Sequence, residues 1–308
     1  MTETASGLVL RSRSGFVTVL TDDGERVEAR LRGRLKKERQ SADIVVIGDR
    51  VRVEHLPDGT GAIASVEPRE AVFSRRQPGP RGSWREDVLV ANPDLVAAVF
   101  ACAHPPPNPR LIDRFLVVAE YNEVPTLIVA NKVDLVGRGA AEEIFGAYQR
   151  IGYDVVYTSA KARIGLDELH QRLAGRLSIV TGPSGVGKST LLNAMQPGLR
   201  LATGEVSEVL HKGRHTTTHA ELLPIDDAAG GYVADTPGIR ELGLWEIPST
   251  ELAWCFPEFR AHLGGCAFND CTHLHEPRCS LRAAVGAGEV SEDRYDSYRR
   301  MLTGDLAS

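Results

Sequence analysis

Residues 182–189, GPSGVGKS, have the types and spacing of a phosphate-binding loop, G-x-x-x-x-G-K-[ST]. They stand between an apolar run and a helical stretch, the context that this motif needs. Glycines let backbone N–H groups turn toward phosphate oxygens, and a helix N-terminus adds a favourable dipole. Lys188 would neutralise the β- and γ-phosphates, and Ser189 would ligate Mg²⁺. A chance glycine-rich turn is less favoured than a site formed by Gly182, Pro183, Ser184, Gly185, Val186, Gly187, Lys188, Ser189 and Thr190.

The motif NKVD at residues 131–134 indicates which base the nucleotide carries. A carboxylate at Asp134 can accept two hydrogen bonds from guanine, whereas adenine has no matching pair of donors. TSAK (158–161) follows the next apolar run, and the Ala160 amide there can reach the guanine O6. Either motif alone could be an ordinary strand-to-helix turn, but both beside a phosphate loop favour guanine. The expected base-site residues are Asn131, Lys132, Val133, Asp134, Ser159, Ala160 and Lys161.

A third motif, DTPG (235–238), has the residue types that sense a γ-phosphate. Asp235 suits a position near Mg²⁺, and the Gly238 amide suits a contact with the γ-phosphate. The polar segment 204–219 lies between the phosphate loop and DTPG, and a threonine from its TTT can complete the Mg²⁺ shell. The spacing by itself leaves Thr216, Thr217 and Thr218 as alternatives.

The order of these motifs is permuted. NKVD and TSAK precede the phosphate loop, TTT and DTPG, whereas an ordinary GTP-binding chain begins with the phosphate loop. The same elements are cut between DTPG and NKVD and rejoined through residues 165–175, which domain termini lying close together would permit. The chain then runs from DTPG directly into its C-terminal region, so a switch at the nucleotide would pull on that region.

A cysteine cluster in the C-terminal region has the spacing of a closed tetrahedral zinc site. Four protein ligands leave no open position, so the zinc would be structural. His275 is a second-choice imidazole, and a group of free cysteines is the alternative. Cys102 and Cys255 stand among apolar residues and are expected in the core. The expected ligands are Cys266, Cys271, His273 and Cys279.

These side chains must be positioned by a mostly parallel sheet, because apolar strand-like runs alternate with helical stretches from residue 93. We therefore predict a multidomain α/β protein with a circularly permuted Ras-like P-loop domain. The strands are expected at 95–101, 125–131, 153–159, 177–182, 220–225 and 231–236, and the helices at 109–122, 140–152, 165–175 and 187–196.

The flanking regions differ in pattern from this domain. Short β segments separated by turns predict an OB-type barrel at residues 1–72, with an SH3-like barrel as the alternative. A Pro-, Gly- and Arg-rich linker covers 73–92, the GTPase domain 93–244, and a helical zinc-binding domain 245–308. The C-terminal stretch could contact RNA through Arg294, Arg299 and Arg300.

A basic run near the barrel, RLRGRLKKER (30–39), has six cations and one anion. Such a run is often only a solvated surface, but on an OB-type barrel it also suits RNA phosphates. The phosphate-contact candidates are Arg32, Arg34, Lys36, Lys37 and Arg39.

The bulk properties are those of a globular chain without membrane segments. The 308 residues are 42% hydrophobic and 25% charged, with a net charge of −5. The N-terminus has no apolar stretch typical of a secretory signal, and five cysteines suit a reducing compartment. We expect a cytoplasmic protein that does not bind a membrane.

Several stretches together resemble one family. RLRGRLKKE, PRLIDRFLVVAE, NKVDLV, GPSGVGKSTLLNA, GRHTTTH, DTPGIRELGLW and the zinc ligands are similar to the small-ribosomal-subunit-dependent GTPase A (RsgA) family. The resemblance covers nearly the whole chain. It implies an OB-fold, a permuted GTPase domain and a zinc domain. It also implies a late assembly factor of the 30S ribosomal subunit that binds 16S rRNA and hydrolyses GTP to GDP and phosphate when the subunit stimulates it. Release would follow hydrolysis, and the protein would be a monomer away from the ribosome.

The resemblance also implies roles for individual residues. Ile239 stands where many GTPases have a glutamine that orients the attacking water, and isoleucine cannot do so. His215 is the family's candidate for that task, with a solvent-facing histidine as the alternative. The implied catalytic residues are His215, Lys188 and Thr217, and the implied Mg²⁺ ligands are Ser189, Thr217 and Asp235.

Two other functions fit parts of the sequence. A P-loop enzyme that phosphorylates a small metabolite would tolerate ATP, which NKVD and TSAK disfavour. An RNA-binding module whose nucleotide never turns over is disfavoured by Lys188, Ser189 and Asp235.

Overall fold

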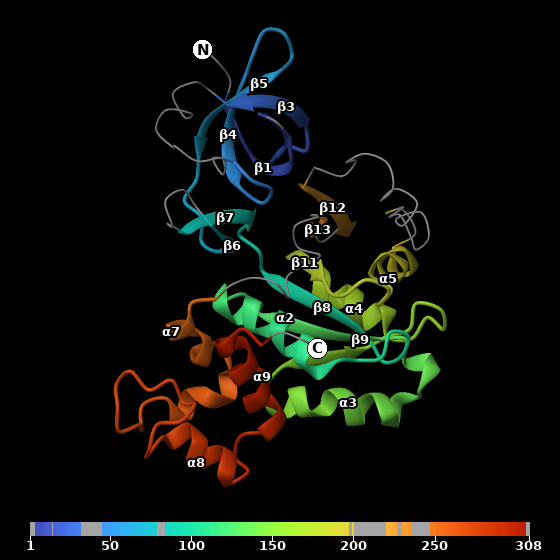
Figure 1. Ribbon diagram of the computed structural model, residues 1–308. Helices are drawn as coiled ribbons and strands as arrows, with labels where there is room; N and C mark the ends of the chain where they lie inside the picture. The colour runs from blue at the N-terminus through green and yellow to red at the C-terminus, as the bar shows by residue number, and fades with distance from the viewer. Residues whose placement is uncertain are drawn as a thin grey trace, which may run out of the picture.

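The computed structural model describes residues 4–13, 15–31, 45–78, 84–196, 199, 220–226, 230–235 and 247–305. Within them, a barrel lies at one end of the molecule, a sheet covered by helices lies in the middle, and a helical region lies at the other end (Figure 1). The chain therefore places the motif-bearing strands between two flanking regions.

The central sheet has the predicted parallel core. Its parallel strands follow the order β10-β9-β8-β11-β13, and an antiparallel strand, β12 (Ala220–Asp226), pairs with β13. Every residue of the central strand β8 is buried, since helices cover both faces of the sheet and leave no polar side. The parallel strands are β8 (Leu95–Ala101), β9 (Thr126–Asn131), β10 (Asp154–Tyr157), β11 (Leu177–Thr181) and β13 (Gly231–Asp235).

In the part of the chain that the structure describes, four helices cover the two faces of this sheet. Alternate residues of β8 enter different cores, because successive side chains of a strand point to opposite faces. Phe100 packs in the core that contains α2 (Pro109–Tyr121) and α3 (Arg138–Arg150). Val99 packs in the core that contains α4 (Leu166–Leu173) and α5 (Lys188–Met195).

The N-terminal strands form a closed five-stranded barrel in the OB-type order β1-β2-β3-β5-β4, which confirms the first expectation and not the SH3-like alternative. Pairing of β1 with β4 closes it, and β3 is parallel to β5. Valines that alternate along the strands fill its interior. The strands are β1 (Thr4–Arg13), β2 (Phe16–Thr21), β3 (Arg26–Leu31), β4 (Arg50–His55) and β5 (Gly61–Val66).

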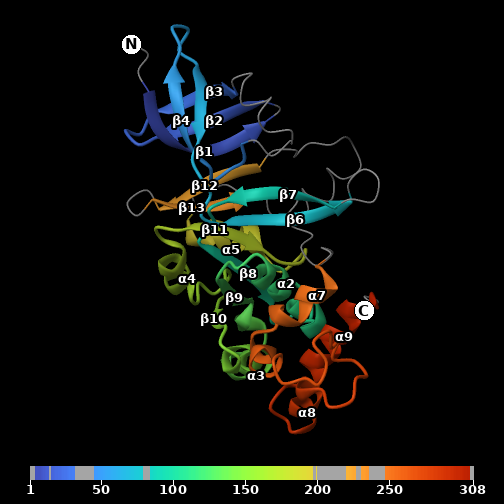
Figure 2. The same cartoon turned by 90° about the vertical axis from the view of Figure 1, so that its left-hand side faces the viewer.

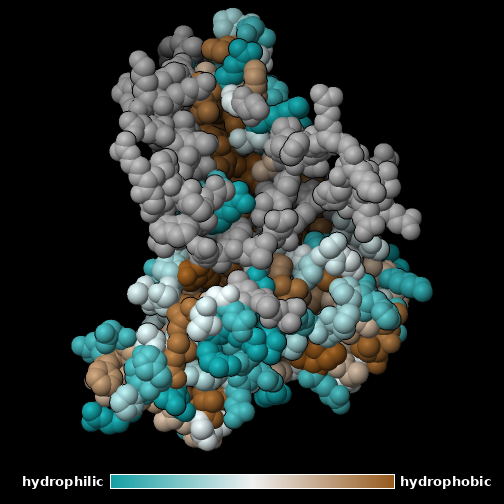
Figure 3. Space-filling view, viewed as in Figure 1, coloured by the Kyte–Doolittle hydropathy of each residue, from teal (hydrophilic) through white to brown (hydrophobic). Residues whose placement is uncertain are grey.

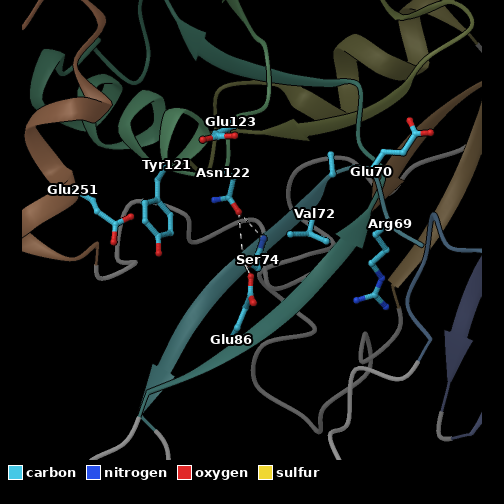
Figure 4. A pocket seen from close by; sticks show the side chains of 10 residues that line it. Arg69, Glu70, Val72, Ser74, Glu86, Tyr121, Asn122, Glu123 and Glu251 are labelled. Carbon is cyan, nitrogen blue, oxygen red and sulfur yellow. Dashed lines mark hydrogen bonds between the residues drawn. The ribbon is translucent and has the colours of Figure 1, made fainter. Parts of the chain in front are cut away.

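The predicted linker contains a two-stranded antiparallel sheet, β6 (Val72–Pro78) and β7 (Trp84–Ala91). Phe73 is fully buried in the core that includes α2, which anchors this hairpin. The Ser74 backbone N–H donates to Asn122 Oδ1 at 2.8 Å, and the Ser74 hydroxyl donates to Glu86 (Figure 4). These residues line a cavity of about 430 Å³ beside the hairpin.

The barrel is joined to the central sheet as well as to the linker. Strand β1 pairs antiparallel with β12, so barrel and parallel strands form one 11-stranded sheet, in which β12 lies next to the barrel (Figure 2). The sequence did not indicate this contact.

The C-terminal region consists of short helices around an aromatic core. Phe256 and Phe259 stack at 4.6 Å between ring centroids, and Tyr298 meets both edge-on. The elements are α7 (Ser249–Leu252), the 3₁₀ helices η4 (Ala253–Cys255) and η5 (Pro257–His262), α8 (Ser280–Gly286) and α9 (Glu292–Thr303).

Arg294 of α9 is buried, which corrects the expectation that it could contact RNA. Its Nη1 donates to Asp113 Oδ1 of α2 at 2.7 Å, and its Nε donates to Glu258 Oε1 of η5 at 2.6 Å. Two carboxylates thus satisfy a guanidinium that is only 7% exposed. Arg299 and Arg300 lie nearer the surface, and both pair with Asp296.

The surface of the described region is mixed in character. On the face in Figure 3, hydrophilic residues are interspersed with hydrophobic ones over the central and C-terminal regions. Among the described residues, no helix has both the length and the apolar character required to cross a bilayer.

Replacing Arg294 by alanine is expected to destabilise the protein by about 3–5 kcal/mol, because two buried carboxylates would lose their shared partner. Urea denaturation followed by tryptophan fluorescence measures this loss. The control is Arg299→Ala, which removes an exposed ion pair and is expected to cost at most about 1 kcal/mol. Equal effects of the two variants would contradict a stabilising role for the buried network.

Candidate functional site

The phosphate loop lies between β11 and α5, as its motif predicts. Gly182 has φ +137°, and a Cβ there would lie 2.1 Å from the Val99 carbonyl oxygen, so only glycine fits against β8. Lys188 Nζ donates to the carbonyl oxygens of Gly182 and Pro183 at 2.6 and 2.7 Å. The loop therefore folds around its own lysine.

The NKVD motif lies directly against this loop. Asn131 Nδ2 donates to the Val186 carbonyl at 2.9 Å, and Lys132 Nζ donates to the Gly185 carbonyl at 2.7 Å. A Cβ on Gly187 would lie 2.8 Å from Asn131 Nδ2, so this glycine permits the close approach. The two motifs meet because β9 and β11 flank β8 in parallel, which puts their carboxyl ends at one edge of the sheet.

The TSAK segment completes the same edge. Thr158 Oγ1 donates to Asn131 Oδ1 at 3.2 Å, and the Val133 N–H donates to the Thr158 carbonyl at 3.1 Å. Ser159 is buried, with its hydroxyl accepting from the Ala162 N–H at 3.0 Å. Ala160 is half-buried and Lys161 is exposed. The loops that follow β9 and β10 are thus hydrogen-bonded to each other, and the loop after β9 is also hydrogen-bonded to the phosphate loop.

Several described residues at the mouth of the site are exposed. Asp134 lies in the 3₁₀ helix η2 (Val133–Leu135) and is exposed, as are Ser184 and Gly185 of the phosphate loop. Ser189 is half-buried and Thr190 is exposed at the start of α5. The structure therefore places a carboxylate and a phosphate loop at one accessible edge.

His104 belongs to this site, and the sequence reasoning missed it. Its carbonyl oxygen accepts a hydrogen bond from Lys132 Nζ, so that lysine bridges the phosphate loop and the loop after β8. The expected strand order could have indicated this loop. A central strand between β9 and β11 must end in a loop that lies between the two motifs.

Other predicted residues lie outside the described part of the chain. These are His215, Thr216, Thr217, Thr218, Gly238, Ile239 and the basic residues Arg32, Arg34, Lys36, Lys37 and Arg39. The backbone of Asp235 ends β13, the neighbour of β11, so its main chain reaches the edge of the sheet that carries the phosphate loop.

The cysteine cluster comes together in the C-terminal region. The four ligand atoms of Cys266, Cys271, His273 and Cys279 lie within 4.8 Å of one another. Cys266 Sγ is 3.9 Å from Cys279 Sγ and 3.5 Å from His273 Nδ1. A tetrahedral zinc with its usual bond lengths requires separations of about 3.5–3.8 Å, so the cluster is compatible with that ion. His275, the second-choice imidazole, is exposed and outside the cluster.

Neighbouring side chains hold the cluster's loop. Tyr295 and Tyr298 of α9 donate to the carbonyl oxygens of His273 and Thr272 at 2.6 and 2.8 Å. Glu276 accepts from the Thr272 hydroxyl and from backbone N–H groups, and these hydrogen bonds, chiefly that from Thr272, lower the pKa of its carboxyl. The loop is thus shaped by protein contacts around the ligand positions.

Cys102 and Cys255 are buried, which confirms that they are core residues. Burial raises the pKa of the Cys102 thiol to about 11 and that of Cys255 to about 12. Both therefore stay as neutral thiols near pH 7, and neither belongs to the metal cluster.

These features define a circularly permuted P-loop GTPase. They are an N-terminal barrel, a parallel sheet in which NKVD precedes the phosphate loop along the chain, and a C-terminal Cys₃His cluster. Family models match on both sides of the barrel boundary: the RsgA N-terminal domain at residues 6–63 and the RsgA GTPase at residues 66–245. The chain belongs to the RsgA GTPase family.

Relatives match over nearly the full length of the chain. The small ribosomal subunit biogenesis GTPase RsgA of Gemmatimonas aurantiaca is 46% identical, covering 98% of this chain and 97% of that protein. RsgA of Geobacillus kaustophilus is 42% identical, covering 96% and 95%.

Solved structures agree with the fold. YjeQ from Thermotoga maritima superposes with a TM-score of 0.80 at 36% identity, covering 99% of this chain and 100% of that one. YloQ, a circularly permuted GTPase, gives a TM-score of 0.73 at 28% identity, covering 98% and 95%. The permutation is therefore a property of related proteins as well.

Cys279→Ser is expected to lose the metal and lower the melting temperature, because one ligand of a four-ligand structural site is removed. Elemental analysis of the purified protein should show about one zinc per wild-type chain and a stoichiometric loss in the variant. His275→Ala, which changes the exposed imidazole beside the cluster, should retain the metal. Full zinc content in Cys279→Ser would contradict the ligand assignment.

Proposed function

We propose that this chain acts in late maturation of the 30S ribosomal subunit as a GTPase that the subunit stimulates. It binds 16S rRNA, hydrolyses GTP to GDP and phosphate, and leaves after hydrolysis. The observation that carries the proposal is the pair of hydrogen bonds from Asn131 and Lys132 to the phosphate loop. They join a guanine motif and a phosphate loop in one site, in a chain related by sequence to small ribosomal subunit biogenesis GTPases.

The proposed chemistry is attack of water on the γ-phosphate without a covalent intermediate. Lys188 and the loop N–H groups would stabilise the developing charge, and the hydrogen bonds that Lys188 now donates to Gly182 and Pro183 show that its ammonium group can reach across the loop. Mg²⁺, when bound, supplies charge neutralisation of the phosphates. Its proposed ligands are Ser189, Thr217 and Asp235, of which Ser189 lies at the start of α5.

The proposed base contacts follow from the accessible edge. Asp134 would accept hydrogen bonds from guanine, the Ala160 amide would reach O6, and Lys132 would lie along the ring. Lys132 is suited to this because its ammonium group is held by two backbone carbonyls. Asn131 stays a bridge between loops and does not read the base.

The flanking regions would hold the protein on RNA. We propose that the basic residues 30–39 of the barrel contact rRNA phosphates and that the Cys₃His cluster holds one structural zinc ion. The protein would act in the cytoplasm, where subunits mature, and would be a monomer away from the ribosome.

A purified wild-type chain is expected to hydrolyse GTP slowly alone and much faster with 30S subunits, with ATP inactive in both cases. Asp134→Asn should weaken GTP binding about 100-fold, since two hydrogen bonds to a charged acceptor are lost. Phosphate release and nucleotide titration measure these effects. Asp167→Asn, an exposed carboxylate of α4, is the control and should behave as wild type. Turnover of ATP equal to that of GTP would support the metabolite-kinase alternative instead, and GTP binding without turnover would support the RNA-binding module.

His215→Ala is expected to lower subunit-stimulated turnover about 100-fold without changing GDP affinity, because Ile239 cannot orient the attacking water. Stopped-flow phosphate release with 30S subunits separates the two quantities. His219→Ala alters a neighbouring histidine of the same segment and should keep most of the stimulated rate. Intact stimulation in His215→Ala would remove that residue from the mechanism.

A further inference from the structure

Strand β1 is shared between the barrel and the GTPase sheet. Its first half pairs with β4, from Thr4 opposite Glu54 to Leu8 opposite Arg50, and so closes the barrel. Its second half pairs with β12, at Arg11 opposite Glu221 and Ser12 opposite Ala220. The register with β2 shifts between Val9 and Arg11, a bulge that bends the strand where it changes partner.

The contact covers a strand that would otherwise be an edge. In the order β11-β13-β12, β12 is the last strand of the GTPase sheet, and an uncovered edge exposes unpaired backbone groups. The barrel covers only the first two residues of β12, Ala220 and Glu221. These residues follow the GRHTTTH segment directly in the chain.

A cross-strand ion pair marks this contact. The Arg11 guanidinium bonds to the Glu221 carboxylate, with side chains 48% and 36% exposed. Exposed pairs contribute little to stability, but like charges directly opposite each other oppose strand pairing. Charge at these two positions is therefore a means of weakening the contact without removing any part of either core.

We propose that Arg11 and Glu221 are positioning residues that couple the barrel to the nucleotide site. The inference rests on the proposed function. Strand β1 pairs with Glu221 of β12, and Glu221 in turn pairs with Asp235, the last residue of β13 and a proposed Mg²⁺ ligand. Docking of the barrel on RNA therefore acts, through β12, on the backbone position of Asp235, and by thermodynamic reciprocity the bound nucleotide biases the barrel. This coupling runs through the N-terminal barrel. It is separate from the direct connection of DTPG to the C-terminal region along the chain.

The test is a charge-reversal cycle with Arg11→Glu, Glu221→Arg and the double variant. Each single reversal is expected to lower subunit-stimulated kcat about 5-fold, with the intrinsic turnover without subunits unchanged. The double variant restores an ion pair of opposite polarity, so its stimulated kcat should return to within about twofold of wild type. Rescue separates coupling from a lost RNA contact, because the double variant still lacks a cation at position 11.

The matched control is Arg50→Glu, which reverses the same charge in an ion pair that lies wholly within the barrel. Arg50 bonds to Asp22 at 2.7 Å, with comparable exposure of the side chains. Its stimulated kcat should stay within about twofold of wild type. Single reversals at Arg11 and Glu221 that match this control would overturn the coupling, as would a double variant no better than Arg11→Glu.

A second readout needs no ribosome. Hydrogen–deuterium exchange of residues 8–13 is compared between the GDP complex and the complex with guanylyl imidodiphosphate, a non-hydrolysable GTP analogue. The coupling requires a nucleotide-dependent difference in wild type that Glu221→Arg abolishes, and identical exchange in the two wild-type complexes overturns it. A wild-type chain that 30S subunits do not stimulate contradicts the proposed function, and the exchange data still decide the coupling.

Discussion

Parallel pairing of β9, β8 and β11 is the constraint on which the remaining structure depends. It brings the ends of two strands to one edge, where Asn131 and Lys132 hydrogen-bond to the phosphate loop across more than fifty residues of chain. Loop position in such a sheet depends on strand order in space and not on order in the chain. The permutation therefore leaves the site intact and changes only which regions enter and leave the domain.

Strand β8 also connects this site to the C-terminal region. The loop after β8 contributes the His104 carbonyl to the site and leads into α2, whose Asp113 holds the buried Arg294. From there α9 reaches the Cys₃His cluster, because Tyr295 donates to the carbonyl oxygen of His273. A path of hydrogen bonds and connecting chain thus runs from the phosphate loop to the loop of the Cys₃His cluster.

Local patterns predicted most of this framework. LVAAVFA coincides with β8, because an uninterrupted apolar run of that length suits a strand covered on both faces. The helix expected at 140–152 lies at 138–150, a shift of the size that helix ends commonly show. The cysteine spacing predicted the Cys₃His cluster, since residues close in sequence need only a short loop to converge. The linker was predicted from its Pro, Gly and Arg content. That content did not predict the hairpin, which is anchored because Phe73 packs in the core of the central sheet and its helices.

The sequence by itself determined the residue types of the nucleotide loop, the base-reading motif and the metal ligands, because each needs a short pattern of particular side chains. Tertiary structure alone decided that Arg294 is buried against Asp113, that Glu221 meets Arg11, and that His104 supports Lys132. Those partners are distant in the chain and carry ordinary charges or backbone carbonyls. Only the packing of strands and helices selects which of many such groups meet, so no local pattern could identify them.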